Sequence, residues 1–343
     1  MKGRRVTIKD IARHLNMSTS TVSRALTNHS DVSEETKRTV MALAEEWDYQ
    51  PDPIAVGLKQ KKTRTIGVII PQIVNPFFSK CISGIQEAVN LRGYNVMITH
   101  SEESLELEKK NLAAMLNSRV DGLLVALSKQ TINTDHFNKA FESETPIVFF
   151  DRVDESVKAS TVIIDDYEAS YNAVQHLVDQ GCKRIAKVAG PQNLLTCRKR
   201  LEGFKDAVKT NGLYYDNDLL VFSSYETYNI KQIADHFLNL NPRPDGICAI
   251  NDSFAIEMIA YLKKAGIRVP EDIAIVGFNN DKVSQFIDPP LSSVESPAHD
   301  LGVEAARLLL EAINDDMAPP QSKVMKSRLV IRESSIKKSF QEV

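Results

Sequence analysis

The chain has 343 residues and a formal net charge of −3, and this charge is unevenly distributed. Residues 1–30 carry six basic side chains and one acidic side chain, or +5, which leaves −8 for the remainder. The acidic remainder argues against a nonspecific chromatin-type protein, whereas a basic head on an acidic body is typical of a polyanion-binding module joined to a further domain. No apolar run approaches the ~20 residues needed to span a bilayer, and the first residues lack the apolar segment of a signal peptide, so we expect a cytoplasmic protein.

Two short amphipathic helices joined by a three-residue turn are predicted by residues 7–26, TIKDIARHLNMSTSTVSRAL. Thr7 can cap the first helix, with Asp10 in the capping-box position, and Ser18 can cap the second. Apolar residues recur at helical spacing, namely Ile8, Ile11, Ala12 and Leu15, then Val22, Ala25 and Leu26. Helices joined so tightly cross at a steep angle, so the second should project from the surface.

The outward residues of the second helix are short hydroxyls followed by an arginine: Thr19, Ser20, Ser23 and Arg24. Short hydroxyls near a helix N-terminus, with an arginine one turn later, suit phosphate and base-edge contacts in a DNA major groove. The alternative is an ordinary helical hairpin whose exposed Ser and Thr bind nothing. The +5 charge of residues 1–30 favours DNA binding.

A third helix, which would complete a small three-helix core, is predicted over residues 32–48, with Trp47 among its apolar residues. Pro51 and Pro53 end this helix. A short apolar stretch then ends at Leu58 and precedes the basic residues Lys59, Lys61, Lys62 and Arg64. Composition alone predicts a basic linker. The alternative is a segment that folds only on DNA, where Leu58 can insert into the minor groove.

From Ile66 onward, short Val- and Ile-rich runs alternate with amphipathic helical stretches. The apolar runs are 66–70, 95–99, 121–126, 146–150, 161–164, 184–190, 245–250 and 272–278. The helical stretches between them include 79–91, 105–118, 168–180 and 254–264. This alternation predicts parallel α/β sheets with helices on both faces, and about 280 residues of it exceed one typical domain, so we expect two lobes.

Aromatic and polar residues follow several of these predicted strands. Ligands of open α/β sheets bind at the carboxyl ends of the strands, where aromatic faces can stack on sugar rings and Asp, Asn and Arg can hydrogen-bond hydroxyls. Any single residue of this kind is more often a cap or a turn residue, but together they form a candidate pocket. Its members are Asn75, Phe77, Phe78, Asp151, Arg152, Arg198, Arg200, Tyr225, Asn251 and Asn279, with Asp252 beside Asn251.

Motifs for catalysis are missing. The 14 glycines include no G-x-G, and neither a P-loop, an HExxH motif nor a G-x-S-x-G elbow occurs. The adjacent Asp165 and Asp166 at a strand end suit helix capping better than acid–base chemistry. Four cysteines, Cys81, Cys182, Cys197 and Cys248, lack metal or redox spacing. We therefore expect no enzymatic activity, no cofactor and no metal.

Three sequence blocks resemble the lactose-repressor (LacI/GalR) family of bacterial transcriptional regulators. They are TIKDIA with TVSRAL in the head, PDPIAVGL, and the IGVIIP run that follows, and the similarity extends to LVIRESS at 329–335. The resemblance implies a helix-turn-helix DNA-binding domain, a hinge, and a two-lobed periplasmic-binding-protein-like α/β core. The chain would cross between the lobes near 165, 293 and 324. The expected domains are 1–50 (DNA-binding), 51–63 (hinge), 64–165 with 294–324 (N-terminal lobe) and 166–293 with 325–343 (C-terminal lobe).

The resemblance also assigns roles to residues of the head. By position, Thr19, Ser20 and Arg24 would read bases, and Thr21 and Ser23 would contact phosphates. Leu58 would be the intercalating hinge residue, and the remaining expected DNA contacts are Thr7, Ser18, Asn28 and Lys59. The family implies a homodimeric repressor of carbohydrate genes, acting on the nucleoid, that binds a near-palindromic operator. A small sugar-like effector in the cleft between the lobes would change its DNA affinity. The alternative is a small-molecule-binding protein or enzyme with an incidental helical head.

Asn279 departs from the family pattern, because many members carry an aspartate there that balances a pocket arginine. If Arg200 faces Asn279, one negative charge is missing from the pocket. We therefore expect an effector with a carboxylate or phosphate, such as a uronic acid or a sugar phosphate, rather than a neutral sugar. Asp151 or Asp252 could supply the balancing charge instead.

Overall fold

The computed structural model describes residues 6–50, 62–223, 229–315 and 317–337. The chain separates into two compact units, residues 1–64 and residues 65–343. Within the described ranges no helix is both long and apolar enough to cross a bilayer.

The first unit is a three-helix module, formed by α1 (Ile8–His14), α2 (Thr19–Leu26) and α3 (Glu34–Glu46). These helices lie where the spacing of apolar residues predicts them. Asn16 lies between α1 and α2 with φ 49°, a left-handed conformation that Asn tolerates better than most residues. The shared core consists of Ile11, Ala12, Val22, Ala25, Val32, Val40, Leu43 and Ala44, with Trp47 packed against it.

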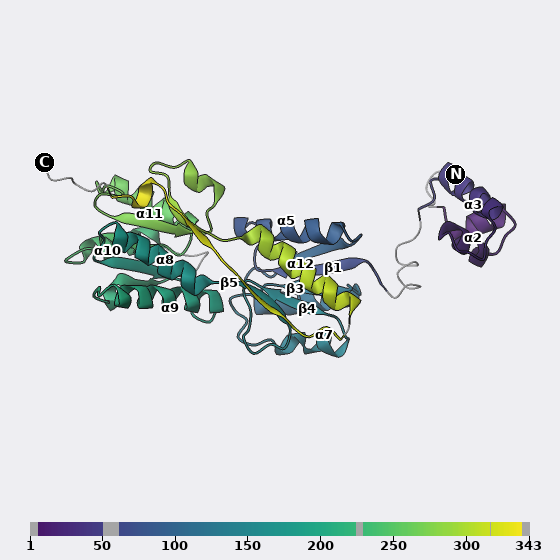
Figure 1. The fold of residues 1–343 in the computed structure, drawn as a ribbon, viewed down its shortest axis with the longest axis horizontal. Helices are drawn as coiled ribbons and strands as arrows, with labels where there is room; N and C mark the ends of the chain where they lie inside the picture. Colours follow the sequence, from purple (N-terminus) through teal and green to yellow (C-terminus); the bar gives the residue numbers. More distant parts are fainter. Residues whose placement is uncertain (1–5, 51–61, 224–228, 316, 338–343) are drawn as a thin grey trace. The chain divides into compact units, whose positions relative to one another are not determined.

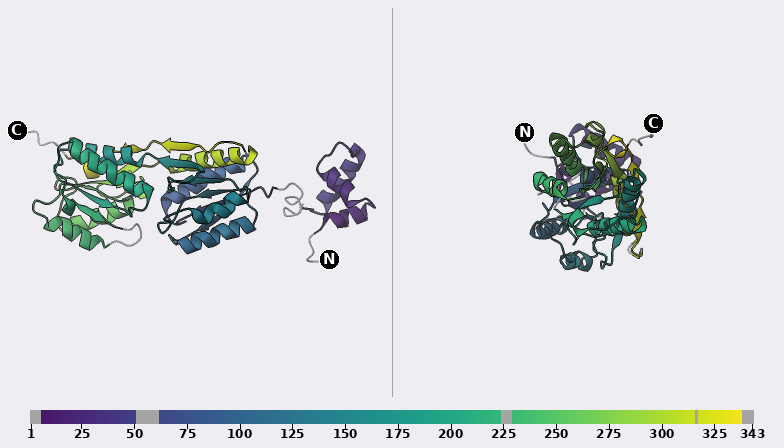
Figure 2. Two further views of the ribbon diagram at one scale, coloured as in Figure 1. Left: turned by 90° about the horizontal axis from the view of Figure 1, so that it is seen from below. Right: turned by 90° about the vertical axis from the view of Figure 1, so that its left-hand side faces the viewer.

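The second unit consists of two lobes, each built around a six-stranded sheet (Figures 1 and 2). The first lobe has the strand order β11-β5-β4-β3-β1-β2, and all its neighbouring strands are parallel. Its strands are β1 (Thr65–Ile70), β2 (Asn95–His100), β3 (Gly122–Val125), β4 (Ile147–Phe150), β5 (Ser160–Ile164) and β11 (Ser322–Met325). Its helices are α5 (Pro76–Asn90), α6 (Leu105–Asn117), α7 (Asn138–Glu142) and α12 (Ala298–Asn314), with the 3₁₀ turn η1 (Asp135–Phe137).

Both faces of the first sheet are covered, which explains why its inner strands β1, β3 and β4 are almost continuously apolar and buried. Ile66 and Val68 of β1 lie in the core shared with α5 and α12, whereas Ile69 lies in the opposite core with α6. Helices α5 and α12 approach each other closely through glycines. A Cβ on Gly84 would lie 2.0 Å from the carbonyl oxygen of His299, and one on Gly302 would lie 2.1 Å from that of Cys81. No larger residue fits at either position without separating the helices.

The second lobe has the strand order β12-β10-β9-β8-β6-β7, in which only the β10–β12 pair is antiparallel among the strands described. Its strands are β6 (Ile185–Ala189), β7 (Leu220–Phe222), β8 (Gly246–Cys248), β9 (Ala274–Phe278), β10 (Ser292–Glu295) and β12 (Arg328–Val330). Its helices are α8 (Asp166–Asp179), α9 (Leu195–Thr210), α10 (Ile230–Asn239) and α11 (Asp252–Lys264). Three 3₁₀ turns complete it, η2 (Asn217–Leu219), η3 (Lys282–Gln285) and η4 (Glu333–Ser335).

The chain passes between the lobes at residue 165, at 296–297 and at 326–327, as the sheet membership of the described strands shows. In Figure 1 the last of these passages is the yellow segment that runs from one lobe to the other. The sequence-based positions of 293 and 324 are therefore three to four and two to three residues too early. The reason is strand pairing: β10 continues along β9 and β12 to Glu295, and β11 continues along β5 to Met325.

Candidate functional site

Helix α2 presents a polar face opposite its buried one. Val22 and Ala25 are fully buried in the core of the first unit, whereas Thr19, Ser20 and Arg24 are exposed. Thr21 and Ser23, expected to contact phosphates, are half-buried along the same helix. The hydroxyls and Arg24 are thus available together on one short helix, as DNA reading requires.

The start of α2 is fixed by its cap. The Ser18 hydroxyl oxygen accepts a hydrogen bond from the Thr21 backbone N–H at 3.0 Å. At the start of α1, the backbone N–H and the hydroxyl of Thr7 both donate to the Asp10 carboxylate, at 2.9 and 2.6 Å. Asn28 is exposed just beyond α2 with φ 52°. The remaining predicted DNA contacts, Leu58 and Lys59, lie outside the described residues.

A cavity lies where the two lobes of the second unit meet. Among the described residues it contains every predicted effector residue except Arg198, together with Thr196, which the sequence analysis missed. The lining residues are Asn75, Phe77, Phe78, Asp151, Arg152, Thr196, Arg200, Asn251 and Asn279. The first five follow β1 and β4 of the first lobe, and the others belong to the second lobe.

Two of the lining residues are also helix caps. The Asn75 side chain accepts a hydrogen bond from Phe77 N–H at the start of α5, and the Asn251 side chain accepts one from Phe254 N–H at the start of α11, both at 2.9 Å. Each of these two side chains therefore caps a helix and lines the cavity at the same time. The remaining donor groups of each amide are the parts that can contact a ligand.

Arg152 is held by a buried carboxylate behind the cavity. Its Nη1 donates to both carboxylate oxygens of Glu103, at 2.7 and 2.8 Å, and its guanidinium lies 5.5 Å from the centre of the Phe78 ring. The neighbouring Asp151 has φ 59°. Burial raises the pKa of Asp151 to about 7, against the opposing positive charge of Arg152.

Arg200 is paired with Asp166. Its Nε donates to Asp166 Oδ1 at 2.6 Å, and its guanidinium stacks 3.5 Å from the centre of the Phe278 ring. Both partners of the ion pair are buried. Burial raises the pKa of the Asp166 carboxyl, while the charge and hydrogen bond of Arg200 oppose that shift.

This pair corrects two expectations. Asp165 does cap α8, because its carboxylate accepts a hydrogen bond from Glu168 N–H at 2.9 Å, but Asp166 serves as the counter-ion of Arg200. The pocket arginine therefore does not lack a negative charge. Asn279 instead has φ 100°, donates its backbone N–H to Val294 O at 2.8 Å and accepts a hydrogen bond from Ser296.

A lysine that the sequence analysis overlooked lies behind the cavity. Lys187 is buried in the middle of β6, and burial lowers its pKa. The only signal in the sequence was a lysine inside an apolar strand. With it, the buried charges around the cavity comprise three acidic and three basic side chains, Glu103, Asp151 and Asp166 with Arg152, Lys187 and Arg200.

Two of the three further candidates, Arg198 and Asp252, do not line this cavity. Arg198 contacts Glu155 at 3.0 Å on the surface. Asp252 is fully buried beneath the second sheet, where it accepts hydrogen bonds from Ser284 Oγ, Ser293 Oγ and Asp281 N–H at 2.6, 2.5 and 2.7 Å. It is thus committed to the fold and cannot balance a pocket charge. Tyr225 lies outside the described residues.

Asp151 should make the stability of the second unit depend on pH. Its folded-state pKa of about 7 exceeds its ordinary value of 3.8, so the folded protein binds this proton more tightly than the unfolded chain does. The free energy of unfolding should therefore fall as the pH rises from about 5 to 7, by roughly 2 kcal/mol from this group. Asp252, with a pKa of about 6, acts in the same direction.

Asp151→Asn tests this expectation, because Asn tolerates positive φ as Asp does. Urea unfolding followed by circular dichroism between pH 5 and 8 should show a smaller pH slope in Asp151→Asn than in the parent protein. Glu142→Gln, which changes an exposed carboxylate on α7, should keep the parent slope. Parallel slopes for the parent and Asp151→Asn would contradict the prediction.

Two family models match the chain. Residues 7–52 match "Bacterial regulatory proteins, lacI family". Residues 63–337 match "Periplasmic binding proteins and sugar binding domain of LacI family". The two matches correspond to the three-helix module and to the two-lobed unit.

Named relatives align over nearly the whole chain. The HTH-type transcriptional repressor PurR of Photobacterium profundum is 32% identical over 329 residues, which cover 96% of this chain and 98% of the relative. The HTH-type transcriptional repressor CytR of Escherichia coli (strain K12) is 32% identical over 332 residues, which cover 96% of each chain. Among solved structures, a complex of the transcriptional regulator CelR with cellobiose has a TM-score of 0.72 at 27% identity and covers 96% of this chain and 100% of its own.

Proposed function

Since this chain belongs to the LacI family of bacterial regulatory proteins, we propose that it represses transcription by binding an operator through α2 and that an effector between the lobes controls this binding. The observation that carries the proposal is the joint presence of two sites. One is a capped helix with an exposed hydroxyl and arginine face. The other is a cavity lined by charged and aromatic residues of both lobes.

The two sites would be coupled through the lobes. A ligand that contacts both lobes at once would stabilise one angle between them. A change of this angle would move the start of β1, and this movement would reach the segment that connects β1 to the head. In a homodimer, two heads would bind the two halves of a near-palindromic operator, and their spacing would set the DNA affinity. By linkage, operator DNA would change effector affinity by the same factor. Operator binding would place the protein on the nucleoid.

We propose a neutral, hydroxyl-rich effector, such as a sugar, rather than a uronate or sugar phosphate. The reason is the charge balance around the cavity, where Arg152 and Arg200 already pair with Glu103 and Asp166. An anionic effector would add a fourth buried negative charge to a cavity whose two arginines are already paired, which is costly. A neutral sugar would instead use the oxygen of Thr196, the amides and the carboxylate of Asp151 as hydrogen-bond partners.

Calorimetric titration at pH 7.5 with neutral sugars, the matching uronic acids and the matching phosphates tests the effector class. The neutral form of a binding sugar should bind at least about tenfold more tightly than its acidic forms. Tight binding of acidic forms alone would refute a neutral effector and restore the expectation based on Asn279.

Fluorescence anisotropy with DNA from upstream of the protein's own gene tests repression. We expect saturable binding that survives excess random duplex and that shifts in affinity when a binding sugar is added. Failure to bind any duplex at low and moderate salt would overturn the proposed function.

A further inference from the structure

Near the start of α9, two side-chain contacts join the lobes outside the effector cavity, in addition to the hydrogen bond that Lys80 Nζ donates to Asn280 O at 3.4 Å. The Asn193 side-chain amide of the second lobe donates to the Lys129 carbonyl oxygen of the first lobe. Arg198 of the second lobe pairs with Glu155 of the first at 3.0 Å. Arg198 also donates to the Asn193 carbonyl oxygen at 3.4 Å, which links the two contacts on their second-lobe side.

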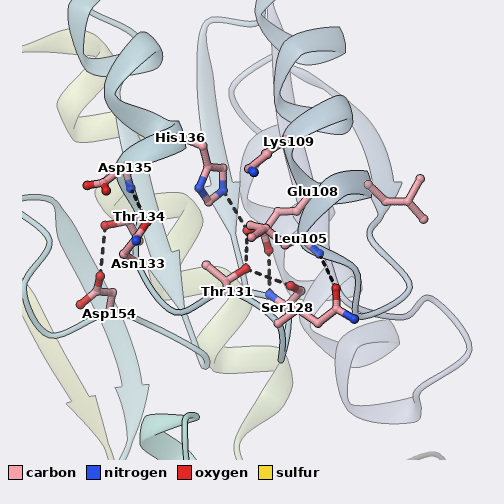
Figure 3. Close-up of polar contacts among 12 residues, drawn as sticks. Leu105, Glu108, Lys109, Ser128, Thr131, Asn133, Thr134, Asp135, His136 and Asp154 are labelled. Atoms are coloured by element: carbon pink, nitrogen blue, oxygen red, sulfur yellow. Dashed lines mark hydrogen bonds and ion pairs between the residues drawn. The ribbon is translucent and has the colours of Figure 1, made fainter.

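Lys129, the first-lobe partner of Asn193, lies in a loop, residues 128–136, which follows β3. Glu108 of α6 is fully buried beneath it and accepts hydrogen bonds from Ser128 N–H at 2.7 Å and Thr131 Oγ1 at 2.7 Å. The same carboxylate lies 2.9 Å from His136 Nε2. Figure 3 shows these groups converging on Glu108. A buried carboxylate with three partners fixes the loop, since freeing it would leave the charge unpaired.

The loop is also connected to the cavity and to the second contact. Lys129 N–H donates to Glu103 at 2.8 Å, and Glu103 is the carboxylate that holds Arg152 of the cavity. Thr134 Oγ1 donates to Asp154 at 3.2 Å, directly before Glu155 (Figure 3). Lys129 and Glu155 therefore belong to one hydrogen-bonded rim of the first lobe.

These contacts lie away from two of the three passages between the lobes, while the third passage, at residue 165, leads into α8, whose Asp166 pairs with Arg200 of α9. Asn193 and Arg198 follow β6, whereas two of the passages leave or enter the second sheet at β10 and β12. Strands β9 and β8 separate β10 from β6, so about 14 Å separate β6 from an axis through these two passages at the usual strand spacing. A rotation of about 10° would then move the contacts apart by about 2–3 Å, beyond hydrogen-bonding distance.

We propose that Asn193–Lys129 and Arg198–Glu155 form a latch that favours the closed arrangement of the lobes. This inference rests on the proposed function, in which the angle between the lobes controls DNA binding. Arg198 therefore acts on the effector cleft without touching its ligand. The latch stabilises the closed arrangement from outside the cavity. The stronger the latch, the less binding free energy the effector must contribute to close the lobes.

Spin labels on the two lobes test the latch without any effector. Lys139→Cys on α7 and Lys209→Cys on α9 provide exposed labelling sites, and the four native cysteines are buried. Pulsed electron spin resonance should show that Arg198→Ala and Asn193→Ala each raise the ratio of open to closed molecules about 2–5-fold, and that the double variant raises it further. The charge reversal Glu155→Arg with Arg198→Glu should restore closure.

Lys199→Met is the matched control. Lys199 is adjacent to Arg198, has a similar exposure and pairs at 2.8 Å with Glu202, but this ion pair lies within α9. A distance distribution in the Arg198→Ala, Asn193→Ala double variant identical to that of Lys199→Met would overturn the latch. If the double variant shifts the distance distribution but the protein binds no DNA, the latch would be supported and only the proposed function would be overturned.

Discussion

Removal of residues 1–64 should lower the affinity for operator DNA by more than about 100-fold, because the helix that would enter the major groove is lost. Residues 65–343 form a compact unit with their own hydrophobic cores and should stay folded. Anisotropy with upstream DNA measures the first effect, and calorimetry with a binding sugar measures the second. A truncated chain that still binds the operator would favour a role for the core in DNA binding. If the intact protein binds only the sugar, it is a small-molecule-binding protein with an incidental head.

A point variant of the head refines this test. Arg24→Ala should weaken operator binding by about 1–3 kcal/mol and random-duplex binding by less, if Arg24 reads a base. Arg38→Ala removes the same charge from an exposed position on α3 and should affect both duplexes alike and weakly. Equal losses of Arg24→Ala on both duplexes would identify Arg24 as a phosphate contact.

Arg200→Ala should destabilise the second unit by about 3–5 kcal/mol, because it leaves the buried carboxylate of Asp166 without its partner. Arg200→Lys should restore only part of the stability, since an ammonium group cannot both pair with Asp166 and stack on Phe278 as the planar guanidinium does. Urea unfolding followed by circular dichroism measures both variants.

The double variant Asp166→Asn with Arg200→Met isolates the ion pair. It should be clearly less destabilised than the sum of its single variants, because neither member of the pair is left as an unpaired buried charge. Lys199→Met, which breaks an exposed pair on the same helix, should change stability by less than about 1 kcal/mol. If Arg200→Ala were as mild as this control, the pair would not be structural.

Much of the architecture could be predicted from local sequence patterns. The three helices of the head are encoded by caps and apolar spacing within about 40 residues, and the sheet strands that are buried on both faces appear as apolar runs such as 66–70. The family match confirmed the predicted family and fold class. The strands β7, β10, β11 and β12 were not predicted, because they have only three or four residues and lie in the sheets only through pairing with distant segments; β10 and β11 are also half-polar.

The sequence by itself determined which polar and aromatic residues gather at the strand ends, because parallel strands bring their carboxyl ends to one edge of a sheet. Only the tertiary structure decided which charges pair there. Asp166 and Arg200 lie 34 residues apart, and Glu103 and Arg152 lie 49 apart, so no local pattern links them. The same limit explains why Arg198 was placed in the pocket although it contacts Glu155, and why Asp252 was considered as a pocket charge although Ser284 and Ser293 surround it. An ion pair depends on where two side chains end in space, whereas strand and helix patterns depend on neighbours along the chain.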